Sequence, residues 1–188
     1  MPRTKLSREE AIERIAEEFR RHGYAATSLS RIAAATGLGR ASLYHRFPGG
    51  KDEMVREVFR KVGEEVGEIL ALLQEPGDPR DRITASVKAV ERFYAGGAKN
   101  CLLGAMVLSG GSELFANELA GAFTAWIDAL SAAIEDANVP RRIAVRRAEN
   151  AVVKLQGALV VKRGTRDPRL FQRMLAELPD ELLAAGSS

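Results

Sequence analysis

The sequence predicts an all-α protein. Aromatic residues make up only 6% of the 188 residues, and alanine and leucine supply much of the apolar content, which favours helix over strand. Apolar residues recur at helical spacing along most of the chain, and no segment shows a convincing strand pattern. Glycine and proline clusters then divide the chain into a small N-terminal unit, one long helix and a larger C-terminal body.

The helices can be placed from their start and stop signals. Ser7-Arg8-Glu9-Glu10 is a capping box, and it predicts a first helix from about Arg8 to Arg21 that stops near Gly23. Thr27 and Ser28 can cap a second helix, which Gly37 ends because glycine tolerates a left-handed backbone. A short third helix starts at Gly39. The later helices are expected over residues 51–74, 80–95, 101–109, 112–137, 140–163 and 168–184.

Several protein classes are excluded by composition. A single cysteine allows neither an intramolecular disulfide framework nor a structural Cys₄ zinc site. No apolar run reaches about 18 residues and the N-terminus leads into a charged helix, so we expect a cytoplasmic protein without a membrane partner. The body has no histidine and few clustered carboxylates. We therefore expect no enzyme, no catalytic residue, no metal site and no cofactor.

Positive charge is concentrated near the N-terminus. Residues 1–60 hold 12 lysines and arginines against 8 acidic residues, whereas residues 61–188 hold 16 against 17. A basic small unit joined to a near-neutral body is typical of a polyanion-binding head. A solvated basic face without a partner would give the same counts.

Residues 27–51, TSLSRIAAATGLGRASLYHRFPGGK, have the spacing of a helix-turn-helix. Small Ala33 lets the two helices cross closely, and Gly37 relieves the turn between them. Leu38 and Leu43 are placed to hold the helices together. A motif of this kind projects its second helix rigidly into a DNA major groove.

The outer face of that second helix carries side chains suited to DNA. Arginine can read guanine or hold a phosphate, while serine, tyrosine and histidine more often hold phosphate oxygens. Alanine permits close approach to a thymine methyl. Helix N-termini add phosphate contacts through their free N–H groups. The expected DNA contacts are Thr27, Ser28, Arg40, Ala41, Ser42, Tyr44, His45 and Lys51.

The same stretch carries a family resemblance. The matching residues are Gly23-Tyr24, Thr27, Ile32-Ala33, Gly37-Leu38, Leu43-Tyr44-His45, Phe47 and Lys51. In these residues the first ~60 positions resemble the DNA-binding head of the tetracycline-repressor (TetR/AcrR) family of bacterial regulators. There are departures from the pattern. Gly39 replaces the usual Ser or Thr at the start of the recognition helix, Arg46 replaces a more common aromatic, and Pro48-Gly49-Gly50 lengthens the turn.

The resemblance implies an organisation for the whole chain. It implies a DNA-binding domain at residues 1–50, a connecting helix at 51–74 and a ligand-binding and dimerisation domain at 75–188. Dimerisation is then expected through residues 145–163 and 168–183. It also implies a ligand cavity among the central helices, although core packing would explain most large apolar side chains there. The expected ligand contacts are Phe93, Met106, Phe123, Trp126 and Gln156.

Together these features predict a homodimeric, ligand-responsive transcriptional regulator. We expect a repressor that binds near-palindromic double-stranded operator DNA and is released by a small apolar inducer. The alternative is an architectural, sequence-nonspecific DNA binder without a ligand. Cys101 also has two interpretations: a small buried hydrophobe, or a redox or electrophile sensor near Lys99.

Overall fold

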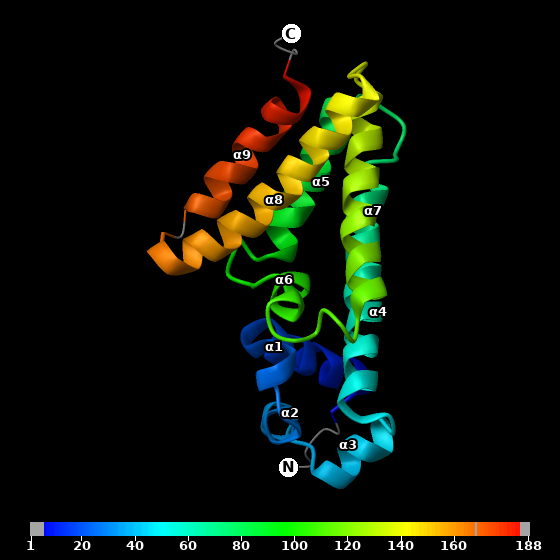
Figure 1. Ribbon diagram of the computed structural model, residues 1–188, viewed down its shortest axis with the longest axis vertical. Helices are drawn as coiled ribbons and strands as arrows, with labels where there is room; N and C mark the ends of the chain where they lie inside the picture. Colours follow the sequence, from blue (N-terminus) through cyan, green and yellow to red (C-terminus); the bar gives the residue numbers. More distant parts are fainter. Residues whose placement is uncertain (1–5, 168, 185–188) are drawn as a thin grey trace. The chain divides into compact units, whose positions relative to one another are not determined.

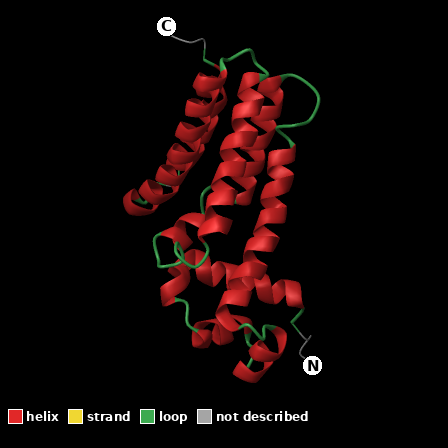
Figure 2. Cartoon of the chain, turned by 45° about the vertical axis from the view of Figure 1, so that its right-hand side comes forward, coloured by secondary structure: helices red, strands yellow, loops and turns green. Residues whose placement is uncertain are grey.

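The computed structural model describes residues 6–167 and 169–184. Over these ranges the chain forms helices and no strand, which confirms the predicted all-α class (Figure 1, Figure 2). Their order agrees with the sequence prediction, although several ends differ. The helices are α1 (Arg8–Ala26), α2 (Leu29–Thr36), α3 (Arg40–Arg46), α4 (Gly50–Ala71), α5 (Pro79–Phe93), α6 (Leu102–Val107), α7 (Ala116–Glu135), α8 (Arg141–Thr165) and α9 (Leu170–Leu183).

The described residues fall into two compact units. The first contains the chain up to Glu64 together with Leu102–Leu119, so it holds α1, α2, α3, α6 and most of α4. The second contains Glu65–Cys101 and the chain from Ala120 onward, including α5, α8, α9 and most of α7. The sequence boundaries at residues 50 and 75 did not anticipate that α6 would pack with the N-terminal helices.

The first unit begins with the predicted capping box. The Ser7 hydroxyl accepts from the Glu10 N–H at 3.0 Å, and the Glu10 carboxylate accepts from the Ser7 N–H at 2.8 Å. The hydrogen bond from the Ser7 backbone lowers the pKa of the Glu10 carboxyl. Fully buried side chains from all four N-terminal helices then form one core: Ile12, Ile15, Phe19, Ile32, Leu43, Phe47, Met54 and Val58.

Glycines account for the main differences in helix ends. The first helix breaks at Gly23 as predicted, with φ 68° and ψ −172° at this residue, and one further turn then carries α1 to Ala26. Helices expected over 101–109 and 112–137 are shorter, since α6 ends at Val107 and α7 begins at Ala116. Gly110 has φ 79°, and the Gly111 N–H returns to the Met106 carbonyl at 3.0 Å. The chain therefore turns tightly after α6 instead of continuing as helix.

The second unit is held by packed helices and by hydrogen bonds at their ends. Asp78 caps α5 by accepting from the Arg80 N–H at 2.8 Å. In the same unit α8 and α9 lie side by side (Figure 1), and Arg147 donates to the carbonyls of Leu182 and Ala184, both at 2.7 Å. This arginine satisfies carbonyls that the end of α9 leaves free. None of the described helices is long and apolar enough to cross a membrane.

Candidate nucleic-acid interface and ligand cavity

The turn between α2 and α3 is fixed by backbone geometry. Gly37 ends α2 in the left-handed conformation, φ 71° and ψ 12°, and its N–H donates to the Ala33 carbonyl at 2.9 Å. The Thr36 hydroxyl donates to the Ile32 carbonyl at 2.7 Å and accepts from the Leu38 N–H at 3.3 Å. Leu43 is 1% exposed and anchors α3 beneath this turn. The two helices are thus held as a rigid helix-turn-helix.

The outer face of α3 is open to solvent. Leu43 and Phe47 point into the core, and the intervening side chains on the other face are exposed, including 51% of Tyr44. The structure therefore brings together on one surface the predicted contacts Arg40, Ala41, Ser42, Tyr44 and His45.

Two exposed arginines in this motif keep their charge available. The Arg40 guanidinium donates Nη2 to the Ser30 hydroxyl at 3.0 Å and forms no ion pair with any described residue. Arg31 lies on α2 with its Nη1 3.4 Å from His22 Nε2, and it too has no carboxylate partner in the described chain. Arg8, by contrast, lies near Glu53 and Glu57. Arg31 was not among the expected DNA contacts, although its place just after the start of α2 was a usable signal.

The residues before α2 divide into one exposed and one buried group. Ser28 is exposed and caps α2, accepting from the Arg31 N–H at 3.2 Å. Thr27 has no exposed surface, and its hydroxyl donates to the Gly23 carbonyl at 2.6 Å. The expectation that Thr27 contacts DNA is therefore corrected, because its side chain closes the end of α1 inside the unit.

Lys51 is also committed to an internal contact. Its ammonium donates to the Tyr24 carbonyl at 3.1 Å and lies 3.9 Å from the centre of the Tyr24 ring. The Tyr24 hydroxyl donates to Asp52 Oδ1 at 2.5 Å. Burial, followed by this hydrogen bond, raises the pKa of Tyr24 to about 12. Lys51 and Asp52 at the start of α4 thus hold the last turn of α1, and Lys51 is half-buried instead of projecting freely.

Arg46, the departure from the family pattern, is also tied to the head. Its Nη1 donates to the Ser7 carbonyl at 3.3 Å, and Arg8 donates to the Arg46 carbonyl at 2.7 Å. The guanidinium of Arg8 lies 4.8 Å from the Phe47 ring centre. These contacts join the start of α1 to the end of α3, so Arg46 stabilises the placement of the recognition helix.

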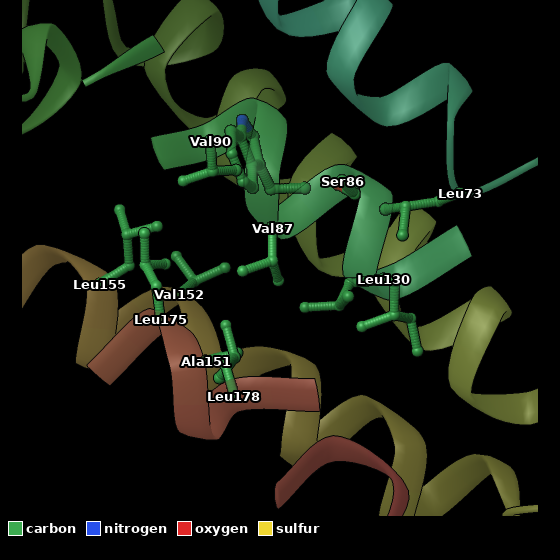
Figure 3. Close-up of a pocket in the computed structure, with 12 residues that line it drawn as sticks. Leu73, Ser86, Val87, Val90, Leu130, Ala151, Val152, Leu155, Leu175 and Leu178 are labelled. Carbon is green, nitrogen blue, oxygen red and sulfur yellow. The ribbon is translucent and has the colours of Figure 1, made fainter. Parts of the chain in front are cut away.

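A narrow apolar cavity lies within the second unit. The cavity has a volume of about 30 Å³, and Figure 3 shows leucine and valine side chains of α5, α8 and α9 around it. Its one hydroxyl, on Ser86, already donates to the Ile69 carbonyl at 3.3 Å. Such a cavity favours an apolar occupant. The lining residues are Leu73, Ile83, Ser86, Val87, Val90, Trp126, Leu130, Ala151, Val152, Leu155, Leu175 and Leu178.

Of the five expected ligand contacts, only Trp126 lines this cavity. Met106 is fully buried in the other unit, so its expected role is corrected by the way α6 packs. Phe93 stacks edge-on against Tyr94 with ring centres 4.9 Å apart. Phe123, like Phe93, is absent from the cavity wall. Gln156 is also outside this wall, because its amide donates to Cys101 Sγ at 3.3 Å.

Cys101 is buried, in agreement with the interpretation of a small core residue. Its sulfur accepts from the Tyr94 hydroxyl at 3.5 Å as well as from Gln156. A thiol enclosed in this way has little access to solvent oxidants.

The N-terminal part of the chain is similar in sequence to known bacterial regulators. The family model for bacterial regulatory proteins of the tetR family matches residues 11–58, which contain most of α1, all of α2 and α3, and the start of α4. The HTH-type transcriptional regulator YxaF of Bacillus subtilis is 34% identical over 83 residues, covering 44% of each chain and so less than half of that relative. Rv0196 of Mycobacterium tuberculosis, also an HTH-type transcriptional regulator, is 26% identical over 183 residues, covering 86% of this chain and 91% of the other.

The fold is shared along the whole chain. A solved structure of the TetR family regulator CifR, a cysteine mutant complexed with 26-bp double-strand operator DNA, aligns with a TM-score of 0.72. The alignment covers 99% of this chain and 100% of the other at 21% identity, so it shows likeness of fold. Residues 11–58 thus match the helix-turn-helix head of the tetR family of bacterial regulatory proteins, and the whole chain shares the all-helical fold of a solved TetR family regulator.

Proposed function

We propose that this regulator is a dimeric repressor that binds a near-palindromic operator and leaves it when a small apolar inducer binds. One observation supports the proposed DNA binding: α3 presents Arg40, Tyr44 and His45 on an exposed face above a rigid turn. A recognition helix held in this way can enter the major groove. Two copies would place their helices in successive grooves about 34 Å apart.

Each exposed side chain is assigned a role by its chemistry. Arg40 is the candidate for base readout, because a guanidinium can bind guanine O6 and N7 together. Tyr44, His45 and Ser42 are assigned to phosphate oxygens, and Ala41 to close approach at a thymine methyl. Ser28 supports the N-terminus of α2 as a further phosphate site, with Arg31 as an added cation. Because Lys51 is already bonded to Tyr24, we assign it a supporting role at most.

The dimer is assigned to α8 and α9. Val153, Val160 and Val161 on α8 are 69%, 64% and 47% exposed, which leaves an apolar strip uncovered in the single chain. Gly157 lies within this strip with open space around it, so another helix can approach closely. The groove between α8 and α9 ends in charges of both signs, Lys154 and Arg173 against Glu177 and Glu181. Such a surface is suited to pairing with the same surface of a second chain.

Oligomeric state tests this assignment. Val160→Glu places a charge in the apolar strip, and we expect monomers in analytical ultracentrifugation where the natural chain forms dimers. Leu108→Glu is the matched control, since Leu108 is 82% exposed in the other unit and should leave the dimer intact. A Val160→Glu protein that remains dimeric contradicts the assignment.

The inducer is assigned to the cavity of the second unit. Its wall contains no charged group and its one hydroxyl is already bonded, so it favours an uncharged apolar molecule and offers a carboxylate no cation. Release requires that the inducer bind more tightly to the conformation that does not fit DNA. In a thermal-shift screen we expect uncharged apolar compounds to raise the melting temperature and matched carboxylates to have no effect. Val87→Trp should abolish the shift by filling the space; an unchanged shift would place the ligand elsewhere.

Binding-site selection from random duplex DNA tests the function as a whole. We expect the purified protein to enrich a palindromic consensus with half-sites about one helical turn apart. Arg40→Ala should weaken binding and relax the preference at one position of each half-site, at a cost of about 1–3 kcal/mol. If nothing is enriched but salt-sensitive binding persists, the protein is a sequence-nonspecific DNA binder instead.

A further inference from the structure

One contact joins the two helices of the helix-turn-helix through their side chains. Arg40, the first residue of α3, reaches back across the turn, and its Nη2 donates to the Ser30 hydroxyl of α2 at 3.0 Å. Both residues are exposed, so this contact does not serve the core. Among the described residues, the Ser30 hydroxyl is the single side-chain partner of Arg40.

The aliphatic part of Arg40 also has apolar neighbours. Arg40 and Tyr44 border a small cleft whose other walls are Leu29, Leu43 and Met54. Its stem therefore lies along apolar surface while its head meets Ser30. An arginine restrained at both ends loses less conformational entropy when it binds a partner.

The chemistry of the partner matters as much as its position. A serine hydroxyl accepts one N–H of the guanidinium but carries no charge, so the positive charge remains available to DNA. An aspartate at this position would neutralise the arginine and repel phosphates. One bonded N–H also leaves the other guanidinium donors for the two acceptors on a guanine edge.

We propose that Ser30 is a positioning residue that orients the Arg40 guanidinium for base readout, and so helps to determine operator specificity. This inference rests on the proposed function, in which Arg40 contacts a base edge. It predicts that Ser30 acts through Arg40 and not through a DNA contact of its own.

A double-mutant cycle tests the proposal, using the duplex that the natural protein selects from random DNA. Ser30→Ala should weaken binding about three- to tenfold, the effect of losing one ordinary hydrogen bond at an exposed site. In an Arg40→Ala background the same change should alter affinity less than about twofold, since its partner is gone. Ser30→Ala combined with His45→Ala should instead be additive. Ser30→Thr keeps the hydroxyl and should restore most of the affinity.

The base preference of the variants distinguishes this role from a purely structural one, because a loss of stability alone would not change which base is preferred. In repeated selections, Ser30→Ala and Arg40→Ala should relax the preference at the same half-site position, while the melting temperature of Ser30→Ala stays near that of the natural protein. Ser30→Asp should bind more weakly than Ser30→Ala.

Three results would overturn the inference. Additive losses for Ser30→Ala and Arg40→Ala would mean that Ser30 meets DNA directly. An unchanged preference in Ser30→Ala would mean that Arg40 needs no orientation. A natural protein with no sequence preference would remove the proposed function and this inference with it, whereas the first two results leave the proposed function standing.

Discussion

The junction at Gly23 gives a sharp prediction about stability. Gly23 has φ 68° and ψ −172°, a region of backbone conformation that only glycine occupies readily. This geometry breaks α1 and releases two N–H groups. The Tyr24 N–H donates to the Ser109 hydroxyl at 2.7 Å, and the Ala25 N–H to the Ser109 carbonyl at 3.0 Å. The segment after α6 thereby takes the place of the missing helical acceptors.

Gly23→Ala should be strongly destabilising. The backbone conformation alone costs about 1–3 kcal/mol for alanine. The new Cβ would also lie 2.1 Å from Ser109 Oγ and 2.9 Å from the Ala105 carbonyl oxygen, so Ser109 has to move. Moving it leaves the Tyr24 N–H without its acceptor, which costs about 1–3 kcal/mol more. We expect a total loss of about 2–6 kcal/mol in the free energy of unfolding, or a fall of roughly 4–24 °C in melting temperature.

Two other glycines in the same unit serve as matched controls. Gly37 has φ 71° but open space around its Cβ position, so Gly37→Ala should cost only the conformational part, about 1–2 kcal/mol. Gly63 lies exposed within α4 with no neighbour near, and Gly63→Ala should stabilise by about 0.5–1 kcal/mol. Urea denaturation of the three variants measures the series. If Gly23→Ala is no worse than Gly37→Ala, the close packing against Ser109 contributes nothing and the reasoning fails.

Three further predictions concern single side chains. Because the fold raises the pKa of Tyr24 from 10.0 to about 12, the unfolded chain loses this proton first. The free energy of unfolding should therefore fall as pH rises across that interval; Tyr24→Phe, followed by urea denaturation on either side of it, should show no such fall. Leu175→Ala, at a cavity residue 3% exposed, should cost about 2–5 kcal/mol, and a loss below 1 kcal/mol would show that the wall collapses without it. Ser28→Ala should lower the free energy of unfolding by about 0.5–2 kcal/mol, measured by thermal unfolding, because α2 loses its N-cap. An unchanged stability would show that this cap does not stabilise the protein.

Local signals in the sequence accounted for the head. The capping box at Ser7, the left-handed Gly37 and the inward positions Leu43 and Phe47 all depend on neighbours within a few residues. Once these fix α2 and α3, helical periodicity determines which side chains of α3 face outward. The exposed group around Arg40 and Tyr44 was therefore predictable, as was the all-helical class.

The contacts that depend on distant residues were not predictable. Lys51 has a side chain suited to phosphate, yet it bonds to the carbonyl of Tyr24, 27 residues earlier, and no local pattern reveals that choice. Thr27 is also suited to phosphate, but the packed unit covers it completely. Likewise Met106 matches the size of a cavity residue but packs with the N-terminal unit.

What the sequence by itself determined is thus the helical class, the order of the helices and the outward face of the recognition helix. Each follows from interactions between residues one to seven positions apart, which a single chain segment encodes. The tertiary structure alone decided that Leu102–Leu119 joins the N-terminal helices and which side chains enclose the cavity. The physical reason is that burial favours any apolar surface of suitable shape, so periodicity identifies a buried face but not the partner that covers it.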